Sequence, residues 1–255
     1  MITLLSDNAV IITITALSCQ ENLITLLSFF VDINTKFNKN ELTGEKMAES
    51  SLDTKQKLLE SAKKEFLEKG FNGASLRTIA ANAGVTTGAM YRHFKDKNAF
   101  FCALVDDAID ASLKVVSLAG TDNHASFDML HIQEHIDLEN KSTSDFMNYM
   151  FDNFDAFTLL LTKAAGSEHE NFQEEICELY TKNCEETFNW MYKHNQITKK
   201  VSSMTVHFMA STTINAFCDI ILHKMTKKEA SAYISDIMEF TRAGCIQVLG
   251  MNAGI

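Results

Sequence analysis

The sequence has no proline among its 255 residues. Average usage of about 5% would give roughly a dozen, and each would interrupt a helix because proline lacks an amide donor and clashes with the preceding turn. The composition is 46% hydrophobic and 22% charged, so the chain can bury a substantial core, and disordered or fibrous classes are excluded. We therefore predict an all-α protein.

The sequence also lacks closely spaced cysteines. Its six cysteines, at positions 19, 102, 177, 184, 218 and 245, form no C-x-x-C pair, which indicates neither a zinc knuckle nor a disulfide scaffold. Buried free thiols in a reducing cytosol are the simplest interpretation, and we expect no metal and no cofactor. Asp128, His131 and His135 share one helical face and leave a divalent-metal site as an alternative, although exposed histidines on an acidic helix are commoner.

Long hydrophobic runs are missing as well. Residues 9–19 and 23–33 are apolar but are separated by polar residues, and each is shorter than the ~20 residues that cross a bilayer. A secretory signal begins with a basic segment, whereas the first lysine here is Lys36 and Asp7 precedes the first run. We predict no membrane span and a cytoplasmic location.

The first 46 residues are predicted to be a peripheral extension. Gly44, Glu45 and Lys46 can be encoded by a purine-rich stretch that resembles a bacterial ribosome-binding site directly before the codon for Met47. We therefore hypothesise that translation starts at Met47, so that residues 1–46 are absent from the native protein. N-terminal sequencing of protein made from the native gene tests this hypothesis.

The net charge of −10 is unevenly distributed. Residues 47–101 carry 9 lysines and arginines against 6 acidic residues, whereas residues 102–255 carry 11 against 22. A short basic segment attached to a larger acidic body suggests a head that binds a polyanion and a body with another task. The sequence contains no Walker loop, H-E-x-x-H, G-x-S-x-G or dinucleotide fingerprint, so an enzyme is not expected.

The basic segment has the pattern of a helix-turn-helix. An amphipathic helix runs from Asp53 to a stop at Gly70, Ser75 caps a short second helix, and Thr86 caps a third that extends to Phe94. A fourth helix begins near Asn98. Two short helices joined by a glycine turn and packed on a longer one form this motif, whereas an ordinary helical hairpin with solvated charges is the alternative.

The run from 57 to 104 contains the stretch AKKEFLEKGFNGASLRTIAANAGVTTGAMYRHFKDKNAFFCAL. This stretch has an aromatic-glycine pair before the second helix, an A-x-x-A-G-V turn, a Tyr-x-His-Phe end of the third helix and Lys97 at the start of the fourth. With these features the run resembles the N-terminal domain of the TetR family of bacterial transcriptional regulators. One departure is that Gly88 and Ala89 leave the middle of the third helix nearly without side chains.

The resemblance implies which residues contact double-stranded DNA. Hydroxyls, bare backbone and cations on the third helix suit a major groove, with Thr86, Thr87 and Gly88 facing it. Arg77 would reach a base edge or a phosphate, and the remaining residues would contact the DNA backbone. The complete predicted set is Arg77, Thr86, Thr87, Gly88, Tyr91, Arg92, His93 and Lys97, whereas Met90 and Phe94 are expected in the core.

The acidic body is predicted to be helical. Its helices are expected over 98–119, 125–138, 143–165, 170–194, 202–224 and 227–250, with breaks at Gly120, Gly166 and near Asn195. An aromatic stripe at helical spacing is usually core, but in a TetR-like body the same face also lines a ligand cavity. The candidate ligand residues are Phe146, Tyr149, Met150, Phe154, Phe157 and Trp190.

The last two predicted helices carry apolar stripes that the resemblance assigns to a homodimer interface. The stripes contain Met204, Phe208, Ala210, Ser211, Ile214 and Phe217 in one helix, and Ile234, Ile237, Met238, Ala243 and Ile246 in the other. The implied organisation is a three-helix DNA-binding domain over 47–101 and a helical effector-binding and dimerisation domain over 102–255.

We therefore predict a dimeric DNA-binding regulator, most simply a repressor. A small hydrophobic or amphipathic ligand is expected to release it from a palindromic operator. Two alternatives remain at the level of sequence: a metal- or redox-responsive regulator that uses His131 and His135 or the cysteines, and a DNA-binding protein that needs no ligand.

Overall fold

The computed structural model describes residues 46–118 and 132–251. The chain divides into two compact units, Met1–Ser51 and Leu52–Ile255, and the helices that begin after residue 73 all belong to the second. Within the described residues the secondary structure is α-helical, apart from an isolated bridge between Ile197 and Met251. The prediction of an all-α fold is therefore confirmed.

The first helices follow the predicted pattern closely. Helix α2 (Lys46–Gly73) contains a non-helical Gly70 with φ 70°, where the long helical run ends. Ser75 caps α3 (Leu76–Asn82) and Thr86 caps α4 (Thr87–Met90), each through its side-chain oxygen. Helix α4 is shorter than predicted, since a turn replaces the helix before Phe94. That turn directs Phe94 inward, where its ring stacks on Phe100 at 3.9 Å between centroids.

The body differs from the prediction at one break. Its helices are α5 (Lys97–Leu118), α6 (Ile132–Asp152), α7 (Phe154–Thr162), α8 (Phe172–Lys193), α9 (Ser203–Leu222) and α10 (Lys227–Leu249). The gap predicted between 138 and 143 is wrong, because α6 continues through it and the chain breaks at Asn153 instead. The breaks at Gly166 and Asn195 are confirmed by their positive φ angles of 88° and 59°. Gly120 and residues 125–131 lie outside the described residues.

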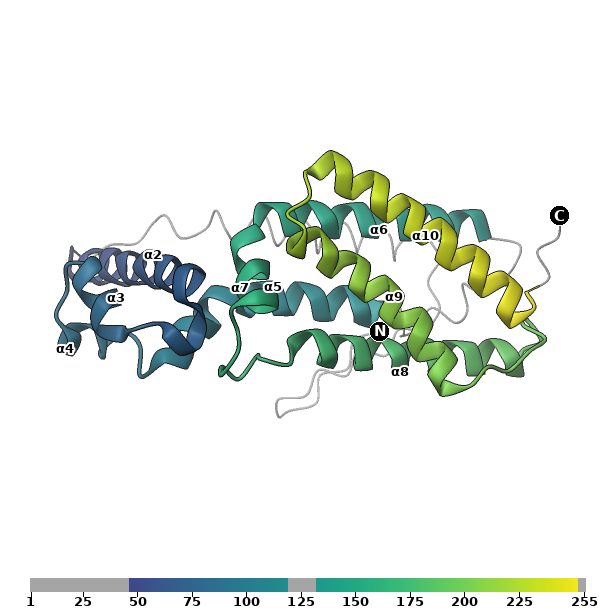
Figure 1. Ribbon diagram of the computed structural model, residues 1–255, viewed down its shortest axis with the longest axis horizontal. Helices are drawn as coiled ribbons and strands as arrows, with labels where there is room; N and C mark the ends of the chain where they lie inside the picture. The colour runs from purple at the N-terminus through teal and green to yellow at the C-terminus, as the bar shows by residue number, and fades with distance from the viewer. Residues whose placement is uncertain (1–45, 119–131, 252–255) are drawn as a thin grey trace, which may run out of the picture. The chain divides into compact units, whose positions relative to one another are not determined.

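One hydrophobic core joins α2–α4 to the body. Buried residues of α2 and α5, including Phe66 and Phe101, belong to the same cluster as Phe157 and Leu160 of α7 and Ile221 of α9. The rings of Phe66, Phe71 and Phe101 pack at centroid distances of 5.4 to 6.0 Å. Helix α5 runs without interruption from the α2–α4 group into the body (Figure 1). The boundary predicted at residue 101 therefore falls inside α5 and inside this core.

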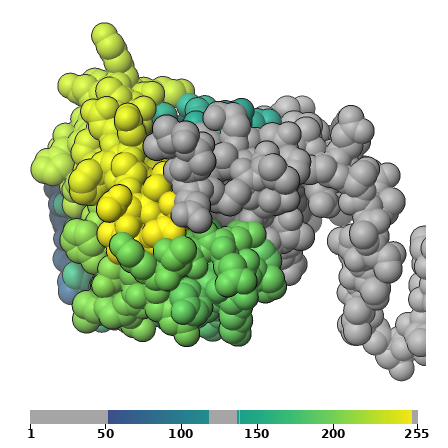
Figure 2. All heavy atoms as spheres, turned by 90° about the vertical axis from the view of Figure 1, so that its right-hand side faces the viewer, coloured from purple at the N-terminus to yellow at the C-terminus, as the bar shows by residue number. Residues whose placement is uncertain are grey.

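Two smaller clusters complete the body. One joins α6, α9 and α10 around Ile220 and Ile234, and the other joins Met191, Ile197 and Leu249. Figure 2 shows the yellow end of α10 against the green connection that follows α8. The amide of Thr198 donates to the carbonyl of Leu249 at 3.2 Å in this region. The end of α10 is thus held to the α8–α9 connection.

Helix α9 is long and apolar enough to cross a membrane by length and composition alone. It packs against α7, α8 and α10, and its buried side chains include Val206, Ala210 and Ile220. A core helix passes the same length test, so this single helix is weak evidence for a membrane span.

The angle between α2 and α3 depends on buried polar side chains of α2. The carboxylate of Glu65, 4% exposed, accepts hydrogen bonds from the amide of Ser75 at 3.1 Å and from the ammonium of Lys69 at 2.9 Å. The hydroxyl of Ser61 donates to the carbonyl of Ile79 at 2.9 Å. These bonds fix the start and the middle of α3 against α2.

We expect Glu65→Ala to destabilise the protein by about 1–3 kcal/mol, because the amide of Ser75 loses its acceptor inside the fold. The free energy of unfolding from urea titration measures this loss. Glu68→Ala, an exposed position on the same helix, is the matched control and should change stability by less than about 0.5 kcal/mol. Equal effects of the two substitutions would contradict the role given to Glu65.

Candidate nucleic-acid interface

The turn between α3 and α4 is built on a glycine. Gly84 has φ 70°, a left-handed conformation that side-chain-bearing residues rarely adopt. The amides of Gly84 and Val85 donate to the carbonyls of Ala81 and Ala80, both at 3.0 Å. These bonds close the turn tightly and hold α3 and α4 at a fixed angle, as a helix-turn-helix requires.

The outward face of this motif carries most of the predicted DNA-binding residues. Arg77, Thr86, Thr87, Gly88, Tyr91 and Arg92 are exposed, and His93 is half-buried. Tyr91 is 54% exposed although its ring is large and apolar. A Cβ atom added at Gly88 would meet nothing within 4 Å, so the backbone there is open to close approach. Met90 and Phe94 are buried, as expected.

The charges on this face favour a polyanion. Within the described residues, neither Arg77 nor Arg92 forms an ion pair with a carboxylate, and Lys95 is 4.0 Å from Asp96 with 82% of its side chain exposed. The neighbouring carboxylates of Glu65 and Asp96 accept backbone amides instead. The guanidinium groups are therefore available to bind DNA phosphates. Such binding is favoured because it releases counterions that are condensed on the DNA.

Lys97 is placed differently from the other predicted contacts. Its ammonium group donates to the carbonyls of Asn72 and Ala74 at 3.3 and 3.4 Å, and it lies 4.7 Å from the ring centroid of Phe71. Lys97 therefore ties the start of α5 to the α2–α3 turn. Its predicted contact with the DNA backbone stays a prediction.

Sequence reasoning missed one cation beside α4. The ammonium of Lys55, on α2, lies 5.9 Å from the ring centroid of Phe94. Lys55 is exposed, so it adds positive charge next to the turn that follows α4. No local spacing in the sequence connects Lys55 with the third predicted helix, because packing of distant segments brings them together.

The candidate ligand residues fall into two places. Phe146, Tyr149, Met150, Phe154 and Phe157 gather in the main core, where Phe146 contacts Phe157 and Phe217 edge to face. The hydroxyl of Tyr149 donates to the carbonyl of Asp107 at 3.0 Å, and burial raises its pKa to about 12, which keeps this donor protonated. Trp190 is apart from them, against the third cluster, with its ring stacked on His194.

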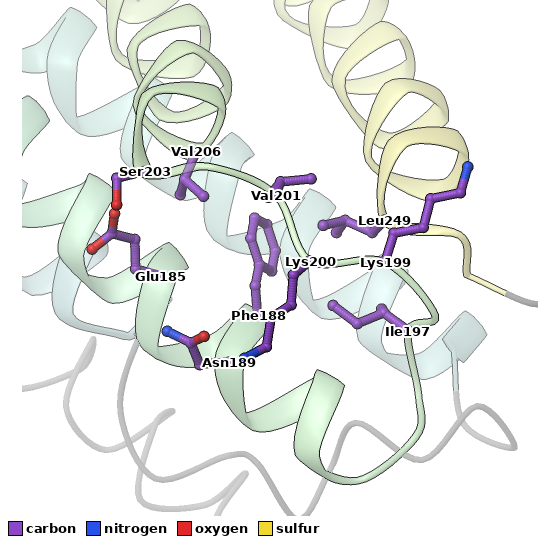
Figure 3. Close-up of a pocket in the computed structure, with 10 residues that line it drawn as sticks. All are labelled: Glu185, Phe188, Asn189, Ile197, Lys199, Lys200, Val201, Ser203, Val206 and Leu249. Atoms are coloured by element: carbon purple, nitrogen blue, oxygen red, sulfur yellow. The ribbon is translucent and has the colours of Figure 1, made fainter.

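A pocket of about 140 Å³ lies at the α8–α9 connection (Figure 3). Its apolar wall is formed by Phe188, Ile197, Val201, Val206 and Leu249, and its polar rim by Glu185, Asn189, Lys199, Lys200 and Ser203. Sites for drug-sized ligands usually measure about 300–1,000 Å³. This pocket is too small for such a ligand in the present conformation, and it contains none of the predicted ligand residues.

Residues 58–104 match the family model described as bacterial regulatory proteins, tetR family. This segment of the chain therefore carries a TetR-type DNA-binding domain. Among curated relatives, the repressor BepR of Brucella suis is 37% identical over 82 residues, or 32% of this chain and 38% of BepR. The regulator AcrR of Shigella flexneri is 43% identical over 56 residues, or 22% of this chain and 26% of AcrR. These matches thus span less than two fifths of each relative.

Solved structures extend the similarity to the body at the level of fold. NalD of Pseudomonas aeruginosa, described as the secondary repressor of the MexAB-OprM multidrug efflux pump, aligns with a TM-score of 0.51 at 18% identity. The alignment covers 75% of this chain and 96% of NalD. The complex of SmeT with triclosan aligns with a TM-score of 0.52 at 17% identity, covering 75% of this chain and 90% of SmeT.

We expect Arg77→Ala to weaken binding to a specific DNA site by about 1–3 kcal/mol if the guanidinium reads a base. Binding of a random duplex should change much less. Gel-shift titrations with both duplexes at several salt concentrations measure the difference. Equal losses on the two duplexes would identify Arg77 as a phosphate contact.

Gly88→Ala tests the close approach of the α4 backbone to DNA. The added methyl group has free space within the protein, so melting temperature should stay the same or rise slightly. Affinity for the specific duplex should fall, because the added methyl group would lie between the α4 backbone and the DNA groove. Unchanged affinity would show that α4 does not approach DNA at Gly88.

Proposed function

We infer that this protein is a dimeric transcriptional repressor of the TetR family that binds a palindromic operator and is released by a small ligand. The observation that carries the inference is the cationic outward face of α3 and α4 within the matched family domain. In functional terms we assign DNA binding to residues 47–101, effector binding and dimerisation to residues 102–255, and a cytoplasmic location. The relatives are regulators rather than enzymes.

A homodimer accounts for the apolar surface of α9 and α10. Met204 and Phe208 on α9 are 74% and 65% exposed, and Phe240 on α10 is 64% exposed. Met204 and Phe208 lie one helical turn apart on α9, and a large exposed apolar patch usually marks an interaction surface. Two copies related by a two-fold axis would cover these side chains and would present two α4 helices to half-sites about 34–36 Å apart. Other members of the predicted stripes, such as Ala210 and Ile234, are buried within the chain itself.

A hydrophobic or amphipathic effector is the ligand class that the body suits best. SmeT, which shares this fold, is described in complex with triclosan, and the aromatic residues of α6 and α7 provide apolar side chains beside α5. A ligand shifts the equilibrium between two conformations only if it binds one of them better. Because α5 belongs to both the DNA-binding motif and the body, a change in its tilt is the simplest way to move α4 relative to the operator.

The metal- or redox-responsive alternative is not favoured by the relatives. Asp128 and His131 lie outside the described residues, and the side chain of His135 is not described.

We expect Phe208→Glu to shift the monomer–dimer equilibrium toward monomer by more than about 2 kcal/mol, because it buries a charge at the centre of the proposed interface. Sedimentation of the full chain measures the equilibrium, and gel shift measures the parallel loss of operator affinity. Leu113→Glu, at an exposed apolar position on α5, is the control. A Phe208→Glu protein that remains dimeric would refute the interface.

We expect triclosan, or another member of a panel of hydrophobic and amphipathic compounds, to raise the melting temperature and to lower operator affinity. A coupling free energy of about 1–3 kcal/mol corresponds to a 5–150-fold change in affinity. Gel shifts with and without each compound test this expectation. Compounds that stabilise the protein but leave operator affinity unchanged would favour a regulator that needs no ligand.

A further inference from the structure

Four side chains with metal-binding atoms meet between α5 and the α7–α8 connection. Cys102 and Asp106 lie one turn apart on α5, whereas Glu168 and His169 belong to the connection, residues 163–171. The thiol of Cys102, a carboxylate oxygen of Glu168 and a ring nitrogen of His169 all lie within 4.8 Å of one another. Segments more than sixty residues apart thus bring three different ligand types together.

The distances between these atoms are close to those around a tetrahedral zinc ion. Bond lengths of about 2.3 Å to sulfur and 2.0–2.2 Å to nitrogen and oxygen place neighbouring ligand atoms about 3.3–3.6 Å apart. The sulfur of Cys102 is 3.6 Å from Nε2 of His169, and Nε2 is 3.9 Å from carboxylate oxygens of both Glu168 and Asp106. In a tetrahedral site the 2.5 Å thiol hydrogen bond from Cys102 to Glu168 would lengthen, and the two 3.9 Å separations from Nε2 would shorten slightly.

The charges of the cluster also favour a cation. Within the described residues, the ion-pairing partner of both Glu168 and Asp106 is His169, with no lysine or arginine. In the part of the chain that the structure describes, these carboxylates therefore have no permanent cation beside them, and a bound divalent ion would offset their charge.

We propose that Cys102, Glu168 and His169, with Asp106 as the fourth ligand, bind one divalent ion of the zinc class. Thiolate and imidazole ligands select zinc and similar transition metals over magnesium and calcium, which prefer oxygen. When the sulfur of Cys102 binds the ion, the thiol proton leaves to solvent and the hydrogen bond to Glu168 is replaced by coordination. Asp106 is 60% exposed, so its side chain is able to rotate toward the ion.

The ion would clamp α5 to a segment that already contacts α2 and the turn after it. The amide of Phe71 donates to the carbonyl of Lys163 at 2.8 Å. Three residues further along the connection, a Cβ atom added at Gly166 would lie only 2.0 Å from the amide oxygen of Asn72. The connection thus touches the DNA-binding motif directly, and metal binding would fix α5 to it. This proposal concerns the metal site alone and does not depend on operator binding.

Cobalt titration of the reduced full chain tests the site. We expect one Co²⁺ per chain, with a thiolate-to-cobalt charge-transfer absorption and the visible bands of a tetrahedral ion, both abolished when Zn²⁺ displaces it. The double variant Cys102→Ser/His169→Gln should bind at least about 100-fold more weakly, since even outer-shell changes cost 10–100-fold. Cys245→Ser/His194→Gln, which changes the same residue types elsewhere, should bind like the wild-type protein.

A second variant covers the case in which Cys102→Ser/His169→Gln does not fold. Asp106→Asn removes one charge at an exposed position, and it should weaken Co²⁺ binding at least tenfold. Amide exchange of residues 163–171 should slow when Zn²⁺ is added to the wild-type protein and not to the Cys102 variant. No charge-transfer band, or a band that persists in Cys102→Ser/His169→Gln and disappears in His131→Gln/His135→Gln, would overturn the assignment.

Discussion

The structure depends on one continuous core that α2, α5 and α7 share. Phe66, Phe71 and Phe101 pack ring to ring, and the same cluster extends to Phe157 and Leu160. Closely packed interiors resist small displacements and adopt discrete arrangements instead. A repacking beside α7 would therefore displace α5, and Lys97 at the start of α5 is bonded to the turn that precedes α3. We propose that ligand response and DNA affinity are coupled through that path.

Polar contacts give the helix-turn-helix its precision. Glu65 and Ser61, on α2, hold α3 in place through hydrogen bonds. Ser75, Thr86 and Asp96 accept hydrogen bonds from backbone amides at the starts of α3, α4 and α5. The carboxylates of Glu65 and Asp96 are engaged with backbone amides and lysines rather than with Arg77 or Arg92. Arg77 and Arg92 are left to face solvent, which gives an acidic protein a local surface suited to DNA.

Local signals in the sequence predicted local structure well. Ser75 and Thr86 act as caps where their positions before short apolar runs indicated, and Gly84 makes the turn that its neighbours required. The break at Asn153 was missed because asparagine inside an apolar-periodic segment is a weak stop signal compared with glycine. The separation of Trp190 from the aromatic stripe, the bonds of Lys97 and the meeting of Cys102 with His169 all depend on tertiary packing. No spacing rule reports such long-range contacts.

Selection of binding sites from a random duplex pool shows whether the protein reads DNA as a two-fold symmetric dimer. A dimer that reads DNA through two α4 helices should enrich a palindrome whose half-sites are centred about one helical turn, or a multiple of it, apart. Enrichment should also disappear when Arg77 and Arg92 are both replaced by alanine. Selection of a single unrepeated half-site, or of the same sequences by the double variant, would contradict this account of the protein.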